Sequence, residues 1–165
     1  MQEAFYIRTG STVQFVTNQT TFVNTVSGGQ LTSMGKDRDQ AAVYEVVVIG
    51  GSTAAGGSII AKFNGKIALK NLCNGKFVGA ENGGVKADRN TDANDVVQFT
   101  IVDPFNYGSN EGIKDFSRVA LKAFDGRWMG STPAGTVDVD GSSITGEEHF
   151  SIMKVDPAAL PKGKC

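Results

Sequence analysis

The chain has 165 residues, which suits one domain with a real core, and its hydrophobic (40%) and charged (20%) fractions are ordinary for a globular protein. The formal net charge of −1 argues against a nucleic-acid partner held by phosphate contacts, because such binding needs a basic excess. No apolar run approaches the roughly 20 residues of a membrane-spanning helix, so no membrane span is expected. Twenty-one Gly against four Pro indicates many turns between short strands.

The first expected elements are strands that recur in three similar stretches, residues 12–49, 66–102 and 118–155. Each stretch begins with apolar residues two apart, which places their side chains on one face of a strand. These pairs are Val13 and Phe15, Ile67 and Leu69, and Val119 and Leu121. The dipeptides Asn74-Gly75 and Asp125-Gly126 then predict tight hairpin turns, since Gly takes a positive φ without steric cost.

Later elements of the three stretches also align. An aromatic residue follows the turn (Phe22, Phe77 and Trp128), and another opens the closing strand (Tyr44, Phe99 and Phe150). No segment shows a helical period with a cap and a stop. About twelve short strands are expected, four per copy, if residues 4–8, 58–62 and 114–117 begin the copies.

This internal repetition predicts an all-β protein with a β-trefoil fold, in which three four-stranded repeats surround a pseudo-threefold axis. Residues 1–165 are expected to form a single domain. Its predicted parts are repeat 1 at about 4–50, repeat 2 at about 58–103, repeat 3 at about 114–156 and a tail at 157–165.

The second copy carries a series of short motifs: Ala68-Leu69-Lys70, Asn74-Gly75-Lys76-Phe77, Ala80-Glu81-Asn82-Gly83-Gly84 and Ala87-Asp88-Arg89. In this order they resemble the repeat of the fascin-like β-trefoil superfamily. The third copy keeps residues 120–122 and 125–128 but has Ser131-Thr132-Pro133-Ala134-Gly135 in place of the bend. The first copy keeps Phe22, Gly28-Gly29 and the closing strand.

The resemblance implies a binding module rather than an enzyme. Fascins proper bundle actin filaments, whereas single fascin-like domains accompany secreted polysaccharide-degrading enzymes. Carbohydrate is therefore the leading expected ligand, bound at loops between the copies. Actin or another protein is the alternative, and an enzyme with an unrecognised carboxylate site is the third hypothesis. No cofactor is expected.

The candidate ligand-binding residues come mainly from the second copy, where the family pattern is best preserved. They are Asn74, Lys76, Glu81, Asn82 and Arg89, together with Asp125 and Arg127 of the third copy and Tyr107 in the loop between them. Planar polar side chains bind sugar hydroxyls, and an exposed aromatic ring packs on a pyranose face. The competing interpretation is structural: Asn74, Asn82 and Asp125 are also common turn residues, and the basic residues are also common solvated charges.

The sequence gives little support for a metal site and leaves the state of the two cysteines open. A single His149 and no Cys/His cluster argue against a zinc site. Residues 136–147 approach a calcium loop, but Thr136 replaces the first Asp, and a strand with outward carboxylates is the better interpretation. Cys73 and Cys165 are either bridged or free thiols. The compartment is extracellular if a signal peptide was removed and cytoplasmic otherwise.

Overall fold

The structure, a computed structural model, describes residues 6–18, 20–25, 29–35, 41–49, 59–81, 83–91, 94–132, 134–142, 144 and 146–156. Its strands are β1 (Thr12–Thr17), β2 (Phe22–Thr25), β3 (Leu31–Gly35), β4 (Tyr44–Ile49), β5 (Lys66–Asn71), β6 (Phe77–Glu81), β7 (Gly84–Arg89), β8 (Phe99–Val102), β9 (Arg118–Lys122), β10 (Trp128–Ser131), β11 (Val137–Gly141) and β12 (Phe150–Lys154). Two single-turn 3-10 helices, η4 (Asp95–Val97) and η5 (Gly146–Glu148), precede β8 and β12. The all-β prediction is confirmed for the part of the chain that the structure describes.

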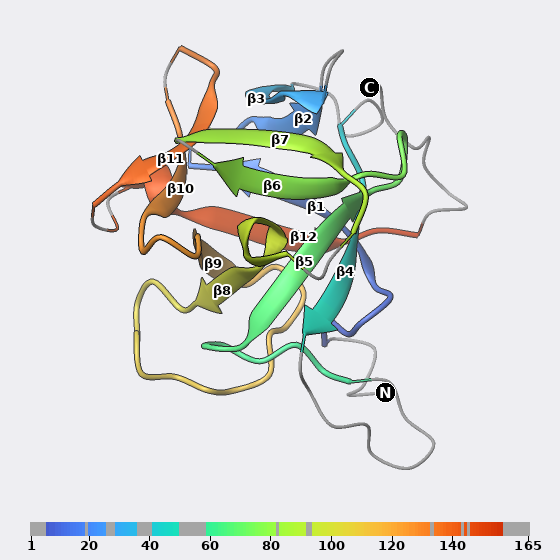
Figure 1. The fold of residues 1–165 in the computed structure, drawn as a ribbon. Coiled ribbons are helices and arrows are strands. Elements are labelled where there is room, and N and C mark those ends of the chain that lie inside the picture. The colour runs from blue at the N-terminus through green and yellow to red at the C-terminus, as the bar shows by residue number, and fades with distance from the viewer. Residues whose placement is uncertain are drawn as a thin grey trace.

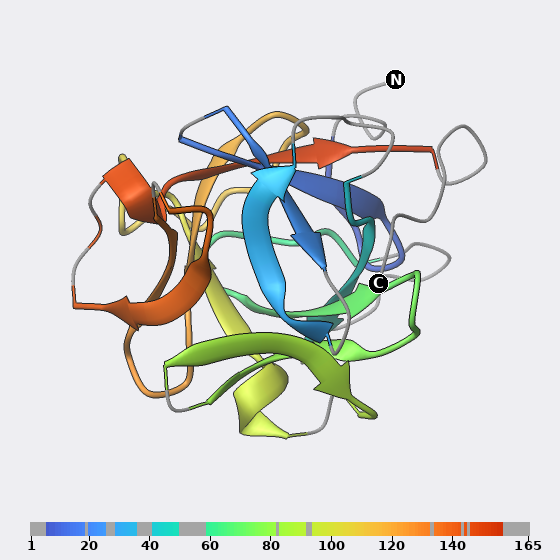
Figure 2. The same cartoon turned by 90° about the horizontal axis from the view of Figure 1, so that it is seen from above.

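The strands form one antiparallel sheet that closes on itself (Figure 1). A circuit of hydrogen-bonded neighbours runs β1–β4–β5–β6–β7–β11–β10–β9–β12 and returns to β1. Strand β8 pairs with both β5 and β9, and the β2–β3 hairpin joins the sheet through β1. Seen from above, the hairpins β2–β3, β6–β7 and β10–β11 lie next to one another and cover one end of the barrel (Figure 2).

This pairing corrects the β-trefoil expected from the sequence. The prediction divided the strands among three equivalent repeats, whereas the structure has one continuous sheet closed through nine of its strands. The three hairpins are also unequal. Hairpins β6–β7 and β10–β11 pair with each other through Asp138 and Gly84, while among the described residues the β2–β3 hairpin meets them at the isolated bridges Gln30–Lys86 and Thr32–Thr136. Turn signals set each hairpin locally, but they do not determine which distant strands pair.

The segments expected to begin the three copies contact one another through isolated β-bridges, and residues 4, 5 and 58 lie outside the described residues. The backbone N–H of Ile7 donates to the carbonyl of Ile113, that of Ile113 to Ala61, and that of Ala61 to Ile7, at 2.8 to 2.9 Å. All three side chains are buried. These mutual hydrogen bonds satisfy backbone groups that would otherwise be buried unpaired, and they close the core where these segments meet.

The core follows the alternation expected from the sequence. Val13, Phe15 and the corresponding apolar pairs of β5 and β9 are buried, as are the aromatic residues that open the closing strands. The Phe15 ring packs against Tyr44 and Phe150 at centroid separations of 6.0 and 6.3 Å. Burial raises the pKa of the Tyr44 hydroxyl, which is hydrogen-bonded to Thr25. The apolar faces of distant strands therefore share one core.

Candidate functional site

Two open hollows lie on the described surface, on different parts of the sheet. The smaller one, of about 180 Å³, lies on the β6–β7 hairpin around Glu81, Asp88 and Arg89, which we call the hairpin cluster. The larger one has a volume of about 400 Å³ and lies on the barrel wall beside β5, β8 and β9. We call it the wall groove. Its polar and aromatic lining residues are Lys66, Asp95, Gln98, Thr100, Lys122 and Phe124.

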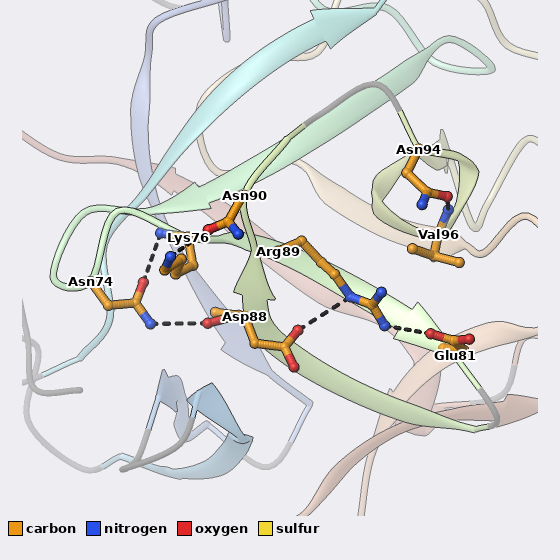
Figure 3. Close-up of polar contacts among 9 residues, drawn as sticks. Asn74, Lys76, Glu81, Asp88, Arg89, Asn90, Asn94 and Val96 are labelled. Atoms are coloured by element: carbon orange, nitrogen blue, oxygen red, sulfur yellow. Dashed lines mark hydrogen bonds and ion pairs between the residues drawn. The ribbon is translucent and has the colours of Figure 1, made fainter.

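The hairpin cluster consists of charged side chains that bind one another (Figure 3). The Arg89 guanidinium donates to the Glu81 carboxylate through Nη2, and its Nε lies 3.3 Å from Oδ1 of Asp88. The bond to Glu81 is the main cause that raises the pKa of Arg89 above its usual value. Two predicted site residues, Glu81 and Arg89, are thus brought together, but as partners of each other.

A glycine allows this arrangement. A Cβ added at Gly79 would lie 2.9 Å from the Cγ of Arg89, which shows that the arginine stem lies directly over the glycine backbone. Gly79 is buried within β6, and Arg89 is paired across the hairpin with Phe77, two residues before it. The side chain therefore lies flat along the hairpin, which positions its guanidinium between the two carboxylates.

Asn74 has a structural role in the β5–β6 turn. Its Oδ1 accepts from the backbone N–H of Lys76 and its Nδ2 donates to the carbonyl of Ala87, each at 2.9 Å (Figure 3). The Lys76 ammonium donates to Oδ1 of Asn90. Asn74 thus joins the turn to β7, and both polar atoms of its side-chain amide form hydrogen bonds with backbone groups. Gly75 follows with φ of +71°, as the Asn-Gly signal predicts.

The third copy repeats this turn with Asp125, whose Oδ1 accepts from the backbone N–H of Arg127 at 3.0 Å. The Arg127 side chain is exposed, and its Nε lies 3.9 Å from the Asp125 carboxylate. Tyr107 lies in the loop after β8, which Figure 1 shows at the end of the barrel away from β6–β7. Its carbonyl accepts from Nδ2 of Asn64, and its side chain is 59% exposed. Asn82 lies outside the described residues.

The predicted site residues therefore do not form one site. They separate into the hairpin cluster, two turns and a distant loop, and the resemblance to one repeat motif does not gather them. The wall groove contains none of them.

The wall groove is built on neighbouring strands, which Figure 1 shows side by side with the turn of η4 above β8. Lys66 of β5 is paired with Thr100 of β8, and Thr100 is paired with Lys122 of β9. Because directly opposed residues in an antiparallel sheet share a face, these three side chains form a row on the outer wall. Their sequence neighbours Ile67, Phe99, Ile101 and Leu121 are buried on the inner face.

Trp128 extends this row onto β10, where it is paired with Lys122. The Lys122 ammonium lies 5.5 Å from the centroid of the half-buried indole ring, within the range of a cation–π contact. This contact holds one cation at the edge of the wall groove. On the other side, η4 supplies Asp95, and the residue that caps its C-terminus, Gln98, leads into β8.

The wall groove has the composition of a binding site. A carboxylate, an amide, a hydroxyl, two ammonium groups and an aromatic ring surround one open hollow. Its volume lies within the range of about 300–1,000 Å³ that is usual for ligand pockets. Phe124 supplies an aromatic side chain that is 56% exposed. Sequence reasoning missed this site because Lys66 and Lys122 lie in different copies. The signal was present in the strands KIALK and RVALK, whose first and fifth positions face outward.

His149 lies outside both hollows. Its imidazole packs edge-to-face on Phe105 at a centroid separation of 5.3 Å. Burial lowers the pKa of His149, the positive charge of Arg118 lowers it further, and Glu148 opposes the shift. Among the described residues, no group of three or more His, Cys, Asp or Glu side chains is placed to hold a metal ion.

Cys73 is disulfide-bonded, which decides between the two alternatives left open by the sequence. The other cysteine of the chain, Cys165, lies outside the described residues. In the described segments, no helix is long and apolar enough to cross a membrane.

Comparisons with known proteins reveal the fold but no family. No family model matches the chain, and no curated protein matches it. A Caenorhabditis elegans protein of unknown function has a similar structure, with a TM-score of 0.71 and 14% identity over 92% of this chain and 98% of that one. The SDF2-like protein from Arabidopsis thaliana is similar at a TM-score of 0.71 and 15% identity, over 89% of this chain and 94% of that one.

These comparisons correct the assignment to the fascin-like β-trefoil superfamily. The similar structures are an SDF2-like protein and a protein of unknown function, and neither supports the fascin-like relationship. The motif match came from one third of the chain, around a hairpin whose turn residues have local structural roles. Short turn motifs recur in unrelated β proteins because the same backbone conformations require them.

Proposed function

We propose that the protein is a non-catalytic carbohydrate-binding module and that its ligand occupies the wall groove. The observation that carries the proposal is the exposed Phe124 ring beside Asp95, Gln98 and Thr100 in one open hollow. A sugar presents hydroxyl groups at its rim and C–H groups on its faces. Such a ligand matches a site that combines an acceptor, an amide and a hydroxyl with an apolar ring.

The hairpin cluster is the weaker candidate for this function. Its guanidinium and carboxylates already bind one another, so a sugar hydroxyl would have to displace an ion pair. Its volume of about 180 Å³ is also below the usual range for ligand pockets. A ligand at the hairpin cluster would gain less, because the broken contacts offset the new ones.

Calorimetric titration with neutral and acidic oligosaccharides tests the proposal. Phe124→Ala is expected to weaken binding about fivefold or more, since aromatic packing contributes about 1 kcal/mol beyond its area. Tyr107→Ala is the matched control, because Tyr107 is equally exposed (59%) but does not line the wall groove. An equal loss in both variants contradicts the placement of the ligand, and no binding of any saccharide by the folded protein contradicts the function.

A protein partner is the second candidate. The loop between β8 and β9 exposes the aromatic side chains of Phe105 (72%), Tyr107 (59%) and Phe116 (68%), and exposed apolar side chains favour protein contacts. Actin filaments are the first partner to test, by co-sedimentation. Pelleting with filaments, abolished by replacing Phe116 with Ser, would support this candidate over the carbohydrate proposal.

A further inference from the structure

We infer that the wall groove is selective for acidic saccharides, whose rings carry a carboxylate or a sulfate group. This inference rests on the proposed carbohydrate function and names its substrate class. It comes from the charges of the outer row formed by Lys66, Thr100 and Lys122, which distinguish the wall groove from the equivalent surfaces of the same barrel.

The two lysines of the row can reach the same anion. Each is directly opposite Thr100, so the strands that carry them are separated by one strand. Neighbouring strands lie about 4.8 Å apart, which places the two stems roughly 10 Å apart on one face. Flexible four-carbon side chains at this separation can bring both ammonium groups to one carboxylate or sulfate, while the Thr100 hydroxyl between them donates a further hydrogen bond.

Neither lysine is neutralised by the described residues. Lys66 is exposed, and Lys122 contacts the Trp128 ring rather than a carboxylate. Within the described part of the chain, neither ammonium lies in an ion pair, whereas Arg89 and Arg127 both do. The charge of these two lysines is thus available to a ligand.

The barrel contains a matched row whose formal charges cancel. Across β1, β4 and β5, the corresponding residues are Thr12, Glu45 and Lys70, paired in that order. Lys70 lies 5.9 Å from the Phe77 ring centroid, as Lys122 lies over Trp128. The difference is the central residue: Glu45 is directly opposite Lys70, where the wall groove has the neutral Thr100. An acidic ligand therefore meets no net formal charge on the row of Thr12, Glu45 and Lys70, whereas it meets two cations on the row of Lys66, Thr100 and Lys122.

The third corresponding row has only one cation. Across β9, β12 and β1 it consists of Arg118, Ser151 and Val16, paired in that order. Val16 replaces the second lysine, so a ligand there would meet one charge and an apolar side chain. Of the three rows, the one in the wall groove alone combines two cations with a neutral centre.

Asp95 makes the site suit an acidic sugar better than a free anion. This exposed carboxylate lines the same hollow and repels an inorganic anion that fills it. A saccharide can place its charged group near the lysines and a hydroxyl near Asp95, where the carboxylate accepts a hydrogen bond. The wall groove thus contains an anion-binding side and a hydroxyl-binding side.

The test compares an oligogalacturonate with a neutral oligosaccharide of equal length by calorimetry at low salt. We expect the wild-type protein to bind the acidic oligomer at least about tenfold more tightly, because hydrogen bonds to charged groups are about twice as strong as neutral ones. The double variant Lys66→Gln/Lys122→Gln should lose this preference, so that it binds the two oligomers with similar affinity. The matched control Lys70→Gln should stay within about twofold of wild type, because that residue lies outside the wall groove and the directly opposed Glu45 leaves its row without net formal charge. Thermal unfolding of each variant verifies that it folds.

Each other outcome overturns a distinct claim. Equal affinity for both oligomers overturns the acidic selectivity but leaves the carbohydrate function standing. An equal loss in Lys70→Gln and in the double variant shows attraction to net charge alone and overturns the assignment of the wall groove. Inorganic sulfate that binds as tightly as the oligogalacturonate overturns the part assigned to Asp95. No binding of either oligomer contradicts the carbohydrate function itself.

Discussion

The hairpin cluster and the wall groove are both open and charged, yet their charges are used differently. In the hairpin cluster, Arg89 lies between Glu81 and Asp88, and its stem lies flat over Gly79. In the wall groove, Lys66 and Lys122 flank a neutral Thr100 and are paired with no described carboxylate. The comparison indicates that polar residues on a conspicuous motif can serve the fold, while a binding surface is assembled from strands distant in sequence.

The largest expected effect concerns the structural side of this comparison. Gly29→Ala should lower the free energy of unfolding by about 3 kcal/mol or more, since the added Cβ would lie 2.6 Å from the Ala87 carbonyl oxygen at a φ of +86°. Gly10→Ala is the control, with a φ of +89° and nothing within 4 Å of its Cβ, and it should cost only about 1–2 kcal/mol. Denaturant titration measures both. Equal losses would show that close packing against β7 adds nothing.

The next largest effect concerns the charges of the wall groove. The affinity of the wild-type protein for an oligogalacturonate should fall several-fold between low and high salt, because salt screens exposed lysines. Affinity for the neutral oligomer should hardly change over the same range. Calorimetry at increasing NaCl concentrations measures both ligands. Parallel curves would mean that Lys66 and Lys122 take no part in recognition.

A smaller effect is expected at the hairpin cluster. Arg89→Met should reduce stability by less than about 1 kcal/mol, since ion pairs exposed to solvent contribute little. Saccharide affinity should remain unchanged, because Arg89 does not line the wall groove. Unfolding and calorimetry of this one variant address both points. A tenfold loss of affinity with intact folding would restore Arg89 to the binding site predicted from its motif.

The smallest effect is a pH dependence from His149. Its pKa is lowered by burial and by Arg118, so the unfolded chain binds a proton more readily than the folded protein does. Stability should therefore fall as the pH drops below about 6.5, the usual pKa of histidine, and continue to fall down to the lower pKa of the folded state. His149→Gln, which introduces the residue found at the corresponding position 98, should flatten this part of the curve. Melting temperatures between pH 7.5 and 5 provide the test, and identical slopes would refute it.

The sequence predicted local structure well and distant pairing poorly. Alternation identified the buried faces of β1, β5 and β9, and Asn74-Gly75 and Asp125-Gly126 identified two turns that the structure contains. These features depend on residues close in the chain. The predicted β-trefoil was wrong because the closure of the sheet depends on pairs such as Asp138 with Gly84, which no local pattern specifies.

The candidate site shows the same limit. Asn74 and Asp125 were proposed to bind a ligand, and the structure gives them backbone hydrogen bonds in turns. Lys66 and Lys122 were overlooked, because 55 positions separate them and only the strand register brings them to one row. A comparison of the outward positions of the copies would have shown that Thr100 stands where the first copy has Glu45. The row of Lys66, Thr100 and Lys122 therefore lacks the carboxylate that the row of Thr12, Glu45 and Lys70 contains.

An NMR titration of the protein with an oligogalacturonate locates the ligand on the barrel. We expect the backbone amides of Lys66, Thr100 and Lys122 to shift with one saturable curve, while those of Lys86, Asp88 and Arg89 stay in place. Shifts confined to the β6–β7 hairpin would place the ligand in the hairpin cluster and would show that the wall groove is not the binding site.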